Sequence, residues 1–319
     1  MGLFQKLRRH AAIATGNFNT MFKGIEIPPL PLAVQRLLAE INNEDPDIDR
    51  LATLISSATG ISAKVIQTVN SSFYSPRSPV SEIKQAVTFL GIKNIRSLVM
   101  AYSVMDAIPR PTGDIFDHEA FWIDSLVRAF FSRSMATVLI KDKAEEAFTA
   151  SLISDVALPV LLSVWSEYYT PIMAEWSQSP ERLSRLEREH FGWDHAQAGA
   201  WIVQSWGFPD ELVCYIGAHN LSMDEIRKLE LTDTIVVPMA ASALWSSVLK
   251  QDPDRIQTMH TAATQLLGIS TAEVVQMITH IKAGLDEVLL LFGLTNRGVG
   301  DALDQLAALA ESTDQEQGE

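Results

Sequence analysis

The sequence has one cysteine, Cys214, among 319 residues. A single thiol excludes an internal disulfide and a zinc cage made of cysteines, so the chain is not a disulfide-stapled secreted domain. Positive charge is also scarce, because 25 Lys and Arg residues stand against 39 Asp and Glu, for a formal net charge of −14. An acidic chain repels phosphate backbones and anionic membranes, so nucleic acid is not expected as the main partner.

Long apolar runs are absent as well. No window reaches the roughly 18 uninterrupted apolar residues of a membrane span, and the first ten residues, MGLFQKLRRH, lack the apolar centre of a signal peptide. We therefore expect no membrane span and a cytoplasmic location. Basic and apolar side chains are mixed within residues 3–10, which leaves open a short amphipathic helix on a lipid surface. A frayed terminus is the alternative.

Familiar catalytic motifs are missing. The sequence contains no GxSxG nucleophile elbow, no phosphate-binding P-loop, no GxGxxG after a strand and no HExxH zinc motif. Strand signals are few, because the β-branched run 234–237 is followed by Pro238 and by small residues that suit a helix. The sequence therefore predicts an all-α protein.

Helical periodicity is the dominant pattern. Apolar residues recur at helical spacing in 83–90, and after Gly91 the spacing starts again and continues to Tyr102. Pro109, Pro111 and Gly113 interrupt the pattern between 106 and 117, where we place a boundary. Later helices are expected at 144 to about 162, 195–206, 209–218, 232–249, 253–267 and 271–291.

We expect five segments along the chain. They are an N-terminal segment 1–24, an N-terminal helical half 25–105, a second helical half 118–220, a helical extension 221–310 and a polar, disordered tail 311–319. The N-terminal helices are too short to be stable alone, so the two halves should pack as one body. Limited proteolysis near Gly113 tests that expectation.

Three residues with ligand chemistry lie in apolar helical settings. Asp155 falls within the apolar run 150–158, where a carboxylate must be paired, hydrogen-bonded or bound to a metal. His195 and His219 are predicted to point inward from consecutive helices. Together they form part of a possible metal site. A complete site needs three or four ligands, each held in position by hydrogen bonds to neighbouring groups. The structural alternative is an aspartate that caps a backbone end and two hydrogen-bonded core histidines.

Several motifs resemble the HDOD domain family. They are Pro29-Leu30-Pro31, Asn70-Ser71-Ser72-Phe73-Tyr74, Leu90-Gly91, Phe121-Trp122, Leu152-Ile153-Ser154-Asp155, Phe191-Gly192-Trp193-Asp194-His195 and Trp206-Gly207-Phe208-Pro209. The resemblance covers about residues 25–220. It implies a compact multi-helix fold in which an N-terminal helical subdomain packs on a degenerate HD-like core. HDOD domains are degenerate relatives of the HD phosphohydrolases and of the HD-GYP phosphodiesterases of cyclic di-GMP, and bacteria use them mostly as regulatory modules.

The resemblance also implies a vestigial metal site. Where the catalytic relatives have a first His, a His-Asp pair, a double His and a final Asp, this chain has Asp124, Ser154-Asp155, His219-Asn220 and Ala241. Asp124 is a possible replacement ligand, although its side chain is shorter than that of His. The substitutions imply no bound metal, no other cofactor and no catalytic residue. The candidate pocket then consists of Asp124, Ser154, Asp155, His195, His219 and Asn220.

The leading hypothesis is a non-catalytic bacterial signal-transduction module. Such a module would bind another signalling protein or a nucleotide second messenger, over the former active site and in the groove between the two halves. One alternative is a metal-dependent HD-type phosphohydrolase or cyclic-dinucleotide phosphodiesterase, whose rearranged site would use Asp124, Asp155, His195 and His219. A second alternative is a purely structural helical scaffold.

A second polar cluster follows an apolar helix in the first half. Asn70, Ser71 and Tyr74 lie just before Pro76 and Pro79. Such a cluster either receives a partner or caps the helix and braces the loop. We take these three residues as a candidate partner surface.

Overall fold

The structure is a computed structural model that describes residues 27–30, 32–41, 47–72, 74–111, 116–245 and 253–317. Within these ranges every regular element is a helix and no strand occurs, so the all-α prediction is confirmed. The segment 1–24, with its lipid-surface hypothesis, lies outside the described residues, as do Phe73 and Gly113.

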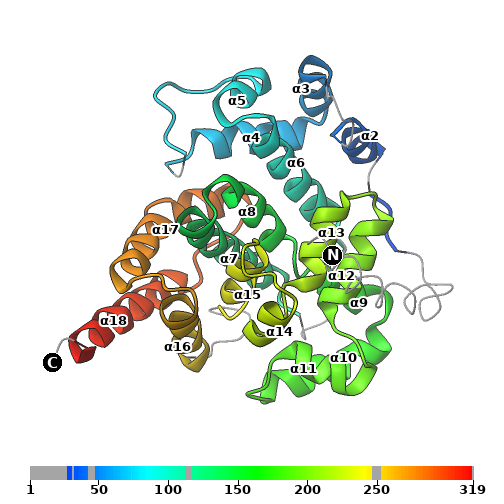
Figure 1. Cartoon of the computed structure of the whole chain (residues 1–319). Helices are drawn as coiled ribbons and strands as arrows, with labels where there is room; N and C mark the ends of the chain where they lie inside the picture. Colours follow the sequence, from blue (N-terminus) through cyan, green and yellow to red (C-terminus); the bar gives the residue numbers. More distant parts are fainter. Residues whose placement is uncertain are drawn as a thin grey trace.

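In the described part of the N-terminal half, the regular elements are five helices, at the top of Figure 1. Their apolar faces meet because the helical spacing of apolar residues lines one side of each helix, and Ile55, Val65 and Ile95 are completely buried. Gly91 separates the last two helices with a φ of 84°, a conformation that favours glycine. The helices are α2 (Leu32–Ile41), α3 (Ile48–Ser57), α4 (Thr59–Asn70), α5 (Ile83–Leu90) and α6 (Ile92–Ala107).

The second half is built around one long helix, α7 (His118–Leu139), which packs against α8, α15 and α17. Asp117 caps its first turn by accepting a hydrogen bond from the backbone N–H of Ala120 at 2.9 Å. The helices that surround it up to residue 242 are α8 (Ala144–Leu152), α9 (Ala157–Val164), α10 (Ser166–Gln178), α11 (Leu183–Phe191), α12 (His195–Ser205), α13 (Asp210–Ala218), α14 (Met223–Lys228) and α15 (Val236–Ser242).

A turn at residues 153–156 divides what the sequence predicts as one helix from 144 to about 162. That prediction is wrong, because α8 ends at Leu152 and α9 begins at Ala157. Pro159 gives the physical reason: it has no N–H to donate to residue 155, so it suits the first turn of a new helix better than the middle of a long one. The turn carries Ser154 and Asp155 out of the regular helical register.

The segment Lys141–Val164 is long and apolar enough to cross a membrane by length and composition alone. However, 89% of its apolar window is buried inside the protein. Burial among other helices is typical of the core of a soluble protein, and such a segment has no free face to present to lipid.

The C-terminal extension consists of α16 (Pro253–Thr261), a π-helical turn η2 (Ala262–Leu266), α17 (Thr271–Leu291) and α18 (Val299–Gln317). Two predictions change here. The expected helix 232–249 is shorter, because residues 232–235 form turns and a bend and α15 spans Val236–Ser242, while 246–252 lie outside the described residues. The predicted disordered tail from residue 311 is corrected as well, since α18 continues through Gln317, where Glu and Gln keep a good helix propensity.

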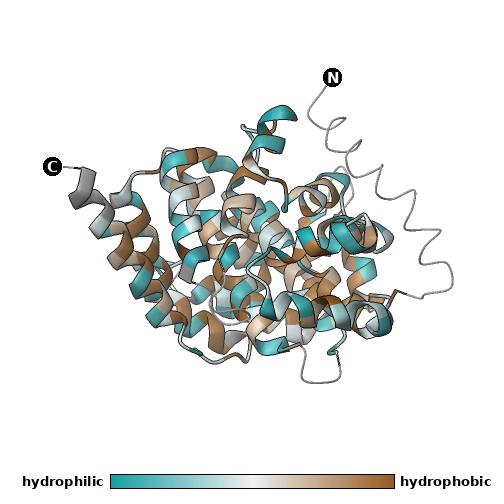
Figure 2. Cartoon of the chain, turned by 90° about the horizontal axis from the view of Figure 1, so that it is seen from below, coloured by the Kyte–Doolittle hydropathy of each residue, from teal (hydrophilic) through white to brown (hydrophobic). Residues whose placement is uncertain are grey.

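The two halves are in contact along several elements. The indole N–H of Trp206 donates to the backbone oxygen of Pro28 at 2.9 Å, and the hydroxyl of Tyr74 donates to Glu145 of α8 at 2.8 Å. Figure 2 shows the hydrophobic residues concentrated on helix faces that meet other helices. The N-terminal subdomain is therefore packed on the HD-like core, as the resemblance implies.

Candidate functional site

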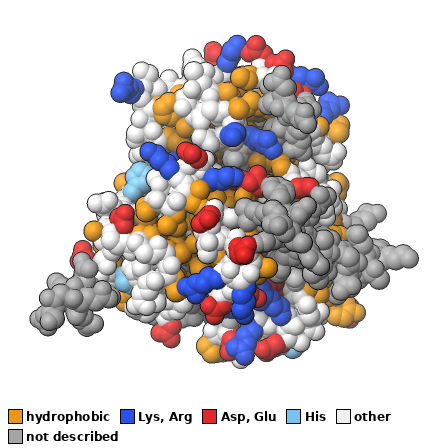
Figure 3. Space-filling view, viewed as in Figure 1, with side chains coloured by type: hydrophobic (Ala, Val, Ile, Leu, Met, Phe, Trp, Pro, Cys, Tyr) orange, Lys and Arg blue, Asp and Glu red, His pale blue; other side chains and the backbone are white. Residues whose placement is uncertain are grey.

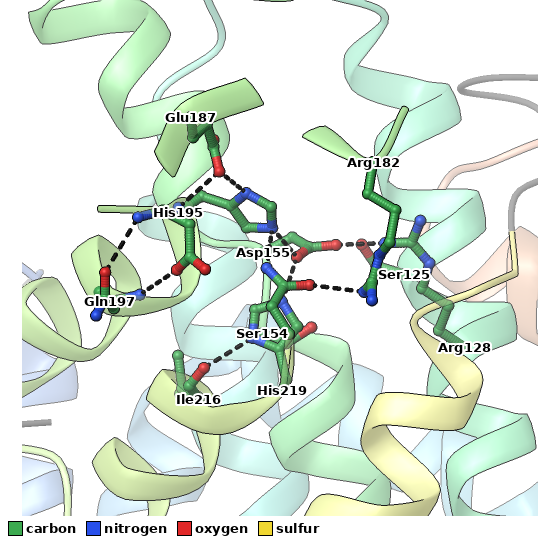
Figure 4. Close-up of polar contacts among 12 residues, drawn as sticks. Ser125, Arg128, Ser154, Asp155, Arg182, Glu187, His195, Gln197, Ile216 and His219 are labelled. Carbon is green, nitrogen blue, oxygen red and sulfur yellow. Dashed lines mark hydrogen bonds and ion pairs between the residues drawn. The ribbon is translucent and has the colours of Figure 1, made fainter. Parts of the chain in front are cut away.

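Asp155 is the centre of a buried polar cluster in the second half. It lies in the turn between α8 and α9, and its side chain is 6% exposed. The histidines come from the start of α12 and the end of α13, because His195 is the first residue of α12 and His219 directly follows Ala218. Arg128 reaches the same carboxylate from the middle of α7 (Figure 4).

The carboxylate of Asp155 uses both oxygens. Its Oδ1 lies 2.9 Å from Nε2 of His219 and 3.2 Å from Nε2 of His195. Its Oδ2 accepts a hydrogen bond from Nη1 of Arg128. The Nε of the same guanidinium donates to the backbone oxygen of Trp245 at 2.9 Å. The guanidinium is therefore held by two acceptors and faces Asp155 from the side opposite the histidines.

Each imidazole ring is oriented by an acceptor on its far side. Nδ1 of His219 donates to the backbone oxygen of Ile216 at 2.7 Å. Nδ1 of His195 lies 2.6 Å from Oε2 of Glu187 in α11, and this oxygen also accepts from the backbone N–H of His195 at 2.9 Å. Both rings consequently present Nε2 to Asp155.

Local sequence explains why α12 begins at His195. Asp194 accepts from the backbone N–H of Gln197 at 3.1 Å, and Gln197 accepts in return from the backbone N–H of Asp194 at 3.2 Å, which makes a capping box. Gly199, one turn into the helix, allows close packing: a Cβ there would lie 3.2 Å from Ile216 and 3.4 Å from the backbone oxygen of Ser154. The glycine lets α12 approach the turn that carries Asp155.

The electrostatics of the cluster follow from burial and charge. Burial alone would raise the pKa of Asp155, but the charge of Arg128 and the hydrogen bonds from the two histidines outweigh it and hold that pKa well below its ordinary value. Burial would lower the pKa of His195, yet the charge of Glu187 and its contacts with Asp155 raise it to about 10. Burial raises the pKa of Glu187. Asp155 is thus an anion between two cationic groups.

Asn220 forms an outer layer with Arg182. The amide oxygen of Asn220 accepts from Arg182 at 3.2 Å, which turns its amide nitrogen toward Nε2 of His195 at 2.8 Å. That contact suits a neutral His195, whereas the two carboxylates favour the imidazolium. Charged hydrogen bonds are stronger than neutral ones, so the carboxylates prevail, and Nε2–H of His195 donates to Asp155.

The cluster is closed to large molecules. A cavity of about 40 Å³ adjoins Asp155, and its walls include Arg128, Arg182, His195 and Asn220. An outer groove of about 440 Å³ shares Arg182 and Asn220 with this cavity. Figure 3 shows positive and negative side chains interspersed over this end of the molecule, where Arg185 pairs with Glu181 and Glu189.

The structure brings together part of the residue set that the sequence indicates. Asp155, His195 and His219 have ligand atoms within 4.8 Å of one another, and Asn220 touches His195. Ser154 turns away and donates to the backbone oxygen of Ser151 at 2.9 Å. Asp124 is buried in α7, one turn before Arg128, and is not a member of the Asp/His/His group. Ala241, the match to the final Asp, is buried in α15.

Sequence reasoning missed Arg128, Glu187 and Arg182. Arg128 sits alone in the apolar run 126–131, and Glu187 follows Leu186 on a helix with an apolar face. A lone charge at a buried helical position needs a partner, and that requirement was the available signal. The identity of the partner depends on helices that are far apart in the sequence.

The HD fold implies a divalent metal at these donors. One carboxylate and two imidazoles are acceptable ligands for zinc, manganese or iron. However, the second carboxylate oxygen already binds the guanidinium of Arg128, whose positive charge opposes a cation at Asp155. The side chains as they stand do not fit a resident metal.

The Asn70 cluster uses its polar groups within the chain. Asn70 donates to the backbone oxygens of Ile66 (3.0 Å) and Val80 (2.7 Å) and accepts from the backbone N–H of Val80 at 2.7 Å. Ser71 donates to the backbone oxygen of Thr68 at 2.7 Å. Tyr74 donates to Glu145 of α8 at 2.8 Å. These contacts favour the loop-bracing interpretation of the cluster.

Comparisons with known proteins identify the family of this chain. The family model described as HDOD domain matches residues 27–222. An uncharacterized protein of Treponema pallidum (strain Nichols) is 23% identical over 201 residues, a match that takes in 61% of this chain and 38% of that protein. The chain therefore spans well under half the length of that relative.

Solved structures show the same fold. An HDOD domain protein with unknown function from Geobacter sulfurreducens superposes with a TM-score of 0.65 at 18% identity, covering 89% of this chain and 99% of that one. A protein provisionally named a phosphohydrolase, from Shewanella amazonensis SB2B, gives 0.60 at 23% identity, covering 93% and 97%. A protein provisionally named a signal transduction protein, from Marinobacter aquaeolei VT8, gives 0.60 at 18% identity, covering 92% and 66%.

At these identities the solved structures establish the fold and leave the activity open. The family model matches more than half of the chain, and its range contains Asp155, His195 and His219. This chain belongs to the HDOD domain family.

Proposed function

We propose that this chain is a non-catalytic bacterial regulatory module that works in the cytoplasm by binding a signalling protein. The observation that carries the proposal is the closed state of the Asp155 cluster. Asp155, His195 and His219 are each at most 6% exposed, and the adjoining cavity measures about 40 Å³. Sites for drug-sized ligands are about 300–1,000 Å³, so a cyclic dinucleotide has no room beside these residues.

The paired charges support the same proposal. Arg128 binds Asp155, and His195 is locked between Asp155 and Glu187. A general base or a ligand must be free to change partners during a reaction. Side chains that are committed to one another stabilise the turn between α8 and α9 instead.

Two surface grooves are the proposed places for partners. One, of about 350 Å³, lies between the halves and is lined by Leu30, Gln35, Ala39 and Trp206, among others. The other is the groove over the Asp155 cluster. A partner recovered with the tagged protein from its host should bind less well to the variants Ala39→Arg and Arg185→Glu. Thr258→Arg, at an exposed position of α16, is the matched control and should bind normally.

The catalytic test is direct. The protein, incubated with cyclic di-GMP and with bis(p-nitrophenyl) phosphate in the presence of Mn²⁺, is expected to release no product beyond a His219→Gln control. Metal-dependent turnover that disappears in His219→Gln contradicts the proposal. Added cyclic di-GMP that raises the melting temperature without turnover identifies a nucleotide second messenger as the ligand of a regulatory module.

An HD-type phosphohydrolase is the second candidate function. The observation that favours it is the convergence of Asp155, His195 and His219, with both rings presenting Nε2. That activity requires Arg128 to leave Asp155 and the cavity to open. The turnover assay separates the two candidates.

A further inference from the structure

Arg128 makes the most unusual contact in the described part of the second half. Its side chain is 13% exposed, and its guanidinium binds a carboxylate that is 6% exposed. A buried charge is costly unless it is paired, so each of these two side chains requires the other. The Nε hydrogen bond to the backbone oxygen of Trp245 gives the guanidinium a second acceptor besides Asp155 and so helps to hold it in place.

The position of the guanidinium explains how the cluster can exist without a divalent ion. Two potential ligands, the Nε2 atoms of His195 and His219, lie next to Oδ1 of Asp155, which is the third. Nδ1 of His195 is engaged by Glu187, and Nδ1 of His219 is engaged by the backbone of Ile216. This is the arrangement in which Nε2 ligates a metal in proteins that have one. The buried anion still needs a positive charge, and Arg128 supplies it at Oδ2.

Asp124 cannot supply that charge, although it matches the first ligand position of the catalytic relatives. It lies exactly four residues before Arg128 on α7, which puts the two side chains on the same face, one turn apart. The helix therefore offers a permanent cation at the turn next to the one where the relatives have a ligand.

We infer that Arg128 is a built-in replacement for a divalent metal ion, and that its removal converts Asp155, His195 and His219 into a working metal site. The inference rests on the proposed function, because a non-catalytic module needs the charge of the ion for stability and not its chemistry. The latent site would take a zinc- or manganese-type cation, given one carboxylate and two imidazole ligands.

The experiment compares the wild type with Arg128→Met, which keeps much of the side-chain volume and removes the charge. Each protein is dialysed against Zn²⁺ or Mn²⁺ alone, analysed for metal content and melted with and without the metal. The wild type should bind no stoichiometric metal and show no shift. Arg128→Met should bind about one ion per chain, at least about tenfold more tightly than the wild type, because a like charge close to the ion has been removed.

Two controls make the result specific. Arg133→Met removes another half-buried arginine of α7 that pairs with a carboxylate, Glu145, but lies outside the Asp155, His195 and His219 group, so it should gain no metal. Arg128→Met/His219→Gln should lose the gained binding. Arg128→Lys keeps a positive charge and should behave as the wild type.

A variant that fails to fold still gives an answer. Arg128→Met can be refolded with and without Zn²⁺, and recovery of the helical circular dichroism only with the metal supports the inference. Failure of both metals to bind or to restore folding overturns it. One ion per wild-type chain, lost in His219→Gln, also overturns it. Without turnover, that last result leaves the proposed regulatory function standing, whereas only turnover removes the function itself.

Discussion

Two polar clusters, one half-buried in the N-terminal half and one buried in the second half, satisfy their hydrogen bonds by different means. The Asn70 cluster joins side-chain amide and hydroxyl groups mainly to backbone groups of α4 and of the α4–α5 loop. The Asp155 cluster joins ionisable side chains from five separate parts of the chain, Arg128, Asp155, Glu187, His195 and His219. Most polar groups of both clusters are hydrogen-bonded, as buried polar groups generally are, although Oε1 of Glu187 has no hydrogen-bond partner. The clusters differ in what remains when one member is removed.

The difference predicts different sensitivities to mutation. A neutral hydrogen bond contributes about 0.5–1.5 kcal/mol net, and its loss leaves small groups that water can reach. A buried ion pair that loses one partner leaves an uncompensated charge and costs about 3–5 kcal/mol. The Asp155 cluster should therefore be the fragile one, even though net stabilisation by an intact buried pair is small.

The largest effect is expected for Asp155→Asn. The change leaves Arg128 buried without its carboxylate, so the free energy of unfolding should fall by about 3–5 kcal/mol in urea denaturation. The double variant Asp155→Asn/Arg128→Met removes both charges and should recover part of the loss. Asp106→Asn breaks the more exposed pair with Lys64 and should cost less than about 1 kcal/mol. Equal losses for the two aspartates would contradict the comparison.

The next largest effect is expected for Glu187→Gln, which should change how the free energy of unfolding depends on pH. The charge of Glu187 is the main cause that raises the pKa of His195 to about 10, against an opposing effect of burial. Asp155 also raises it, and the ring of His219 lies 5.5 Å away, between centroids. Because the unfolded histidine titrates near about 6.5, the stability from its charge is complete below that pH and is lost as the pH rises toward 10.

Unfolding measured between pH 6 and 10 checks this expectation. The wild type should lose stability with rising pH more steeply than Glu187→Gln, in which the pKa of His195 returns toward its ordinary value. At pH 7 the variant should be less stable by about 1–3 kcal/mol, since a charged hydrogen bond is replaced by a neutral one. Parallel pH profiles for the two proteins would show that His195 does not carry the charge assigned to it.

Asn70→Ala tests the neutral cluster. The substitution removes the hydrogen bonds of one amide to Ile66 and Val80, and stability should fall by about 1–2 kcal/mol. Asn94→Ala removes a single bond, to the backbone oxygen of Leu90, and should cost less. If Asn70→Ala instead left the unfolding curve unchanged and abolished partner binding, the candidate partner surface would be supported over loop bracing.

Tyr74→Phe should have the smallest effect. Burial and the nearby Glu145 hold the pKa of Tyr74 well above its ordinary value, so the hydroxyl is neutral and donates one bond. Its removal leaves the 2.5 Å bond between Arg133 and Glu145 and the contact of Arg133 with the ring, 5.4 Å from its centroid. We expect a loss of about 0.5–1 kcal/mol, measured by thermal unfolding. A loss as large as that of Asp155→Asn would erase the distinction between the clusters.

Helix positions were largely readable from local patterns. The start of α12 at His195 follows from the Asp194 cap, and α17 spans the predicted 271–291. The prediction lacks the break between α8 and α9 because the run 150–162 is mostly apolar. Pro159 was a usable signal, since a proline favours the first turn of a new helix. The prediction of a disordered tail rested on its polar composition. Polar residues such as Glu and Gln still have a good helix propensity, so α18 extends to Gln317.

The sequence by itself determined the fold class, the family and three members of the buried cluster, Asp155, His195 and His219. These follow from periodicity and from motifs, which are local properties of the chain. Only the tertiary structure decided that Arg128 pairs with Asp155 and that Glu187 orients His195. A charge in an apolar run reveals that it needs a partner, but the partner is selected by how distant helices pack.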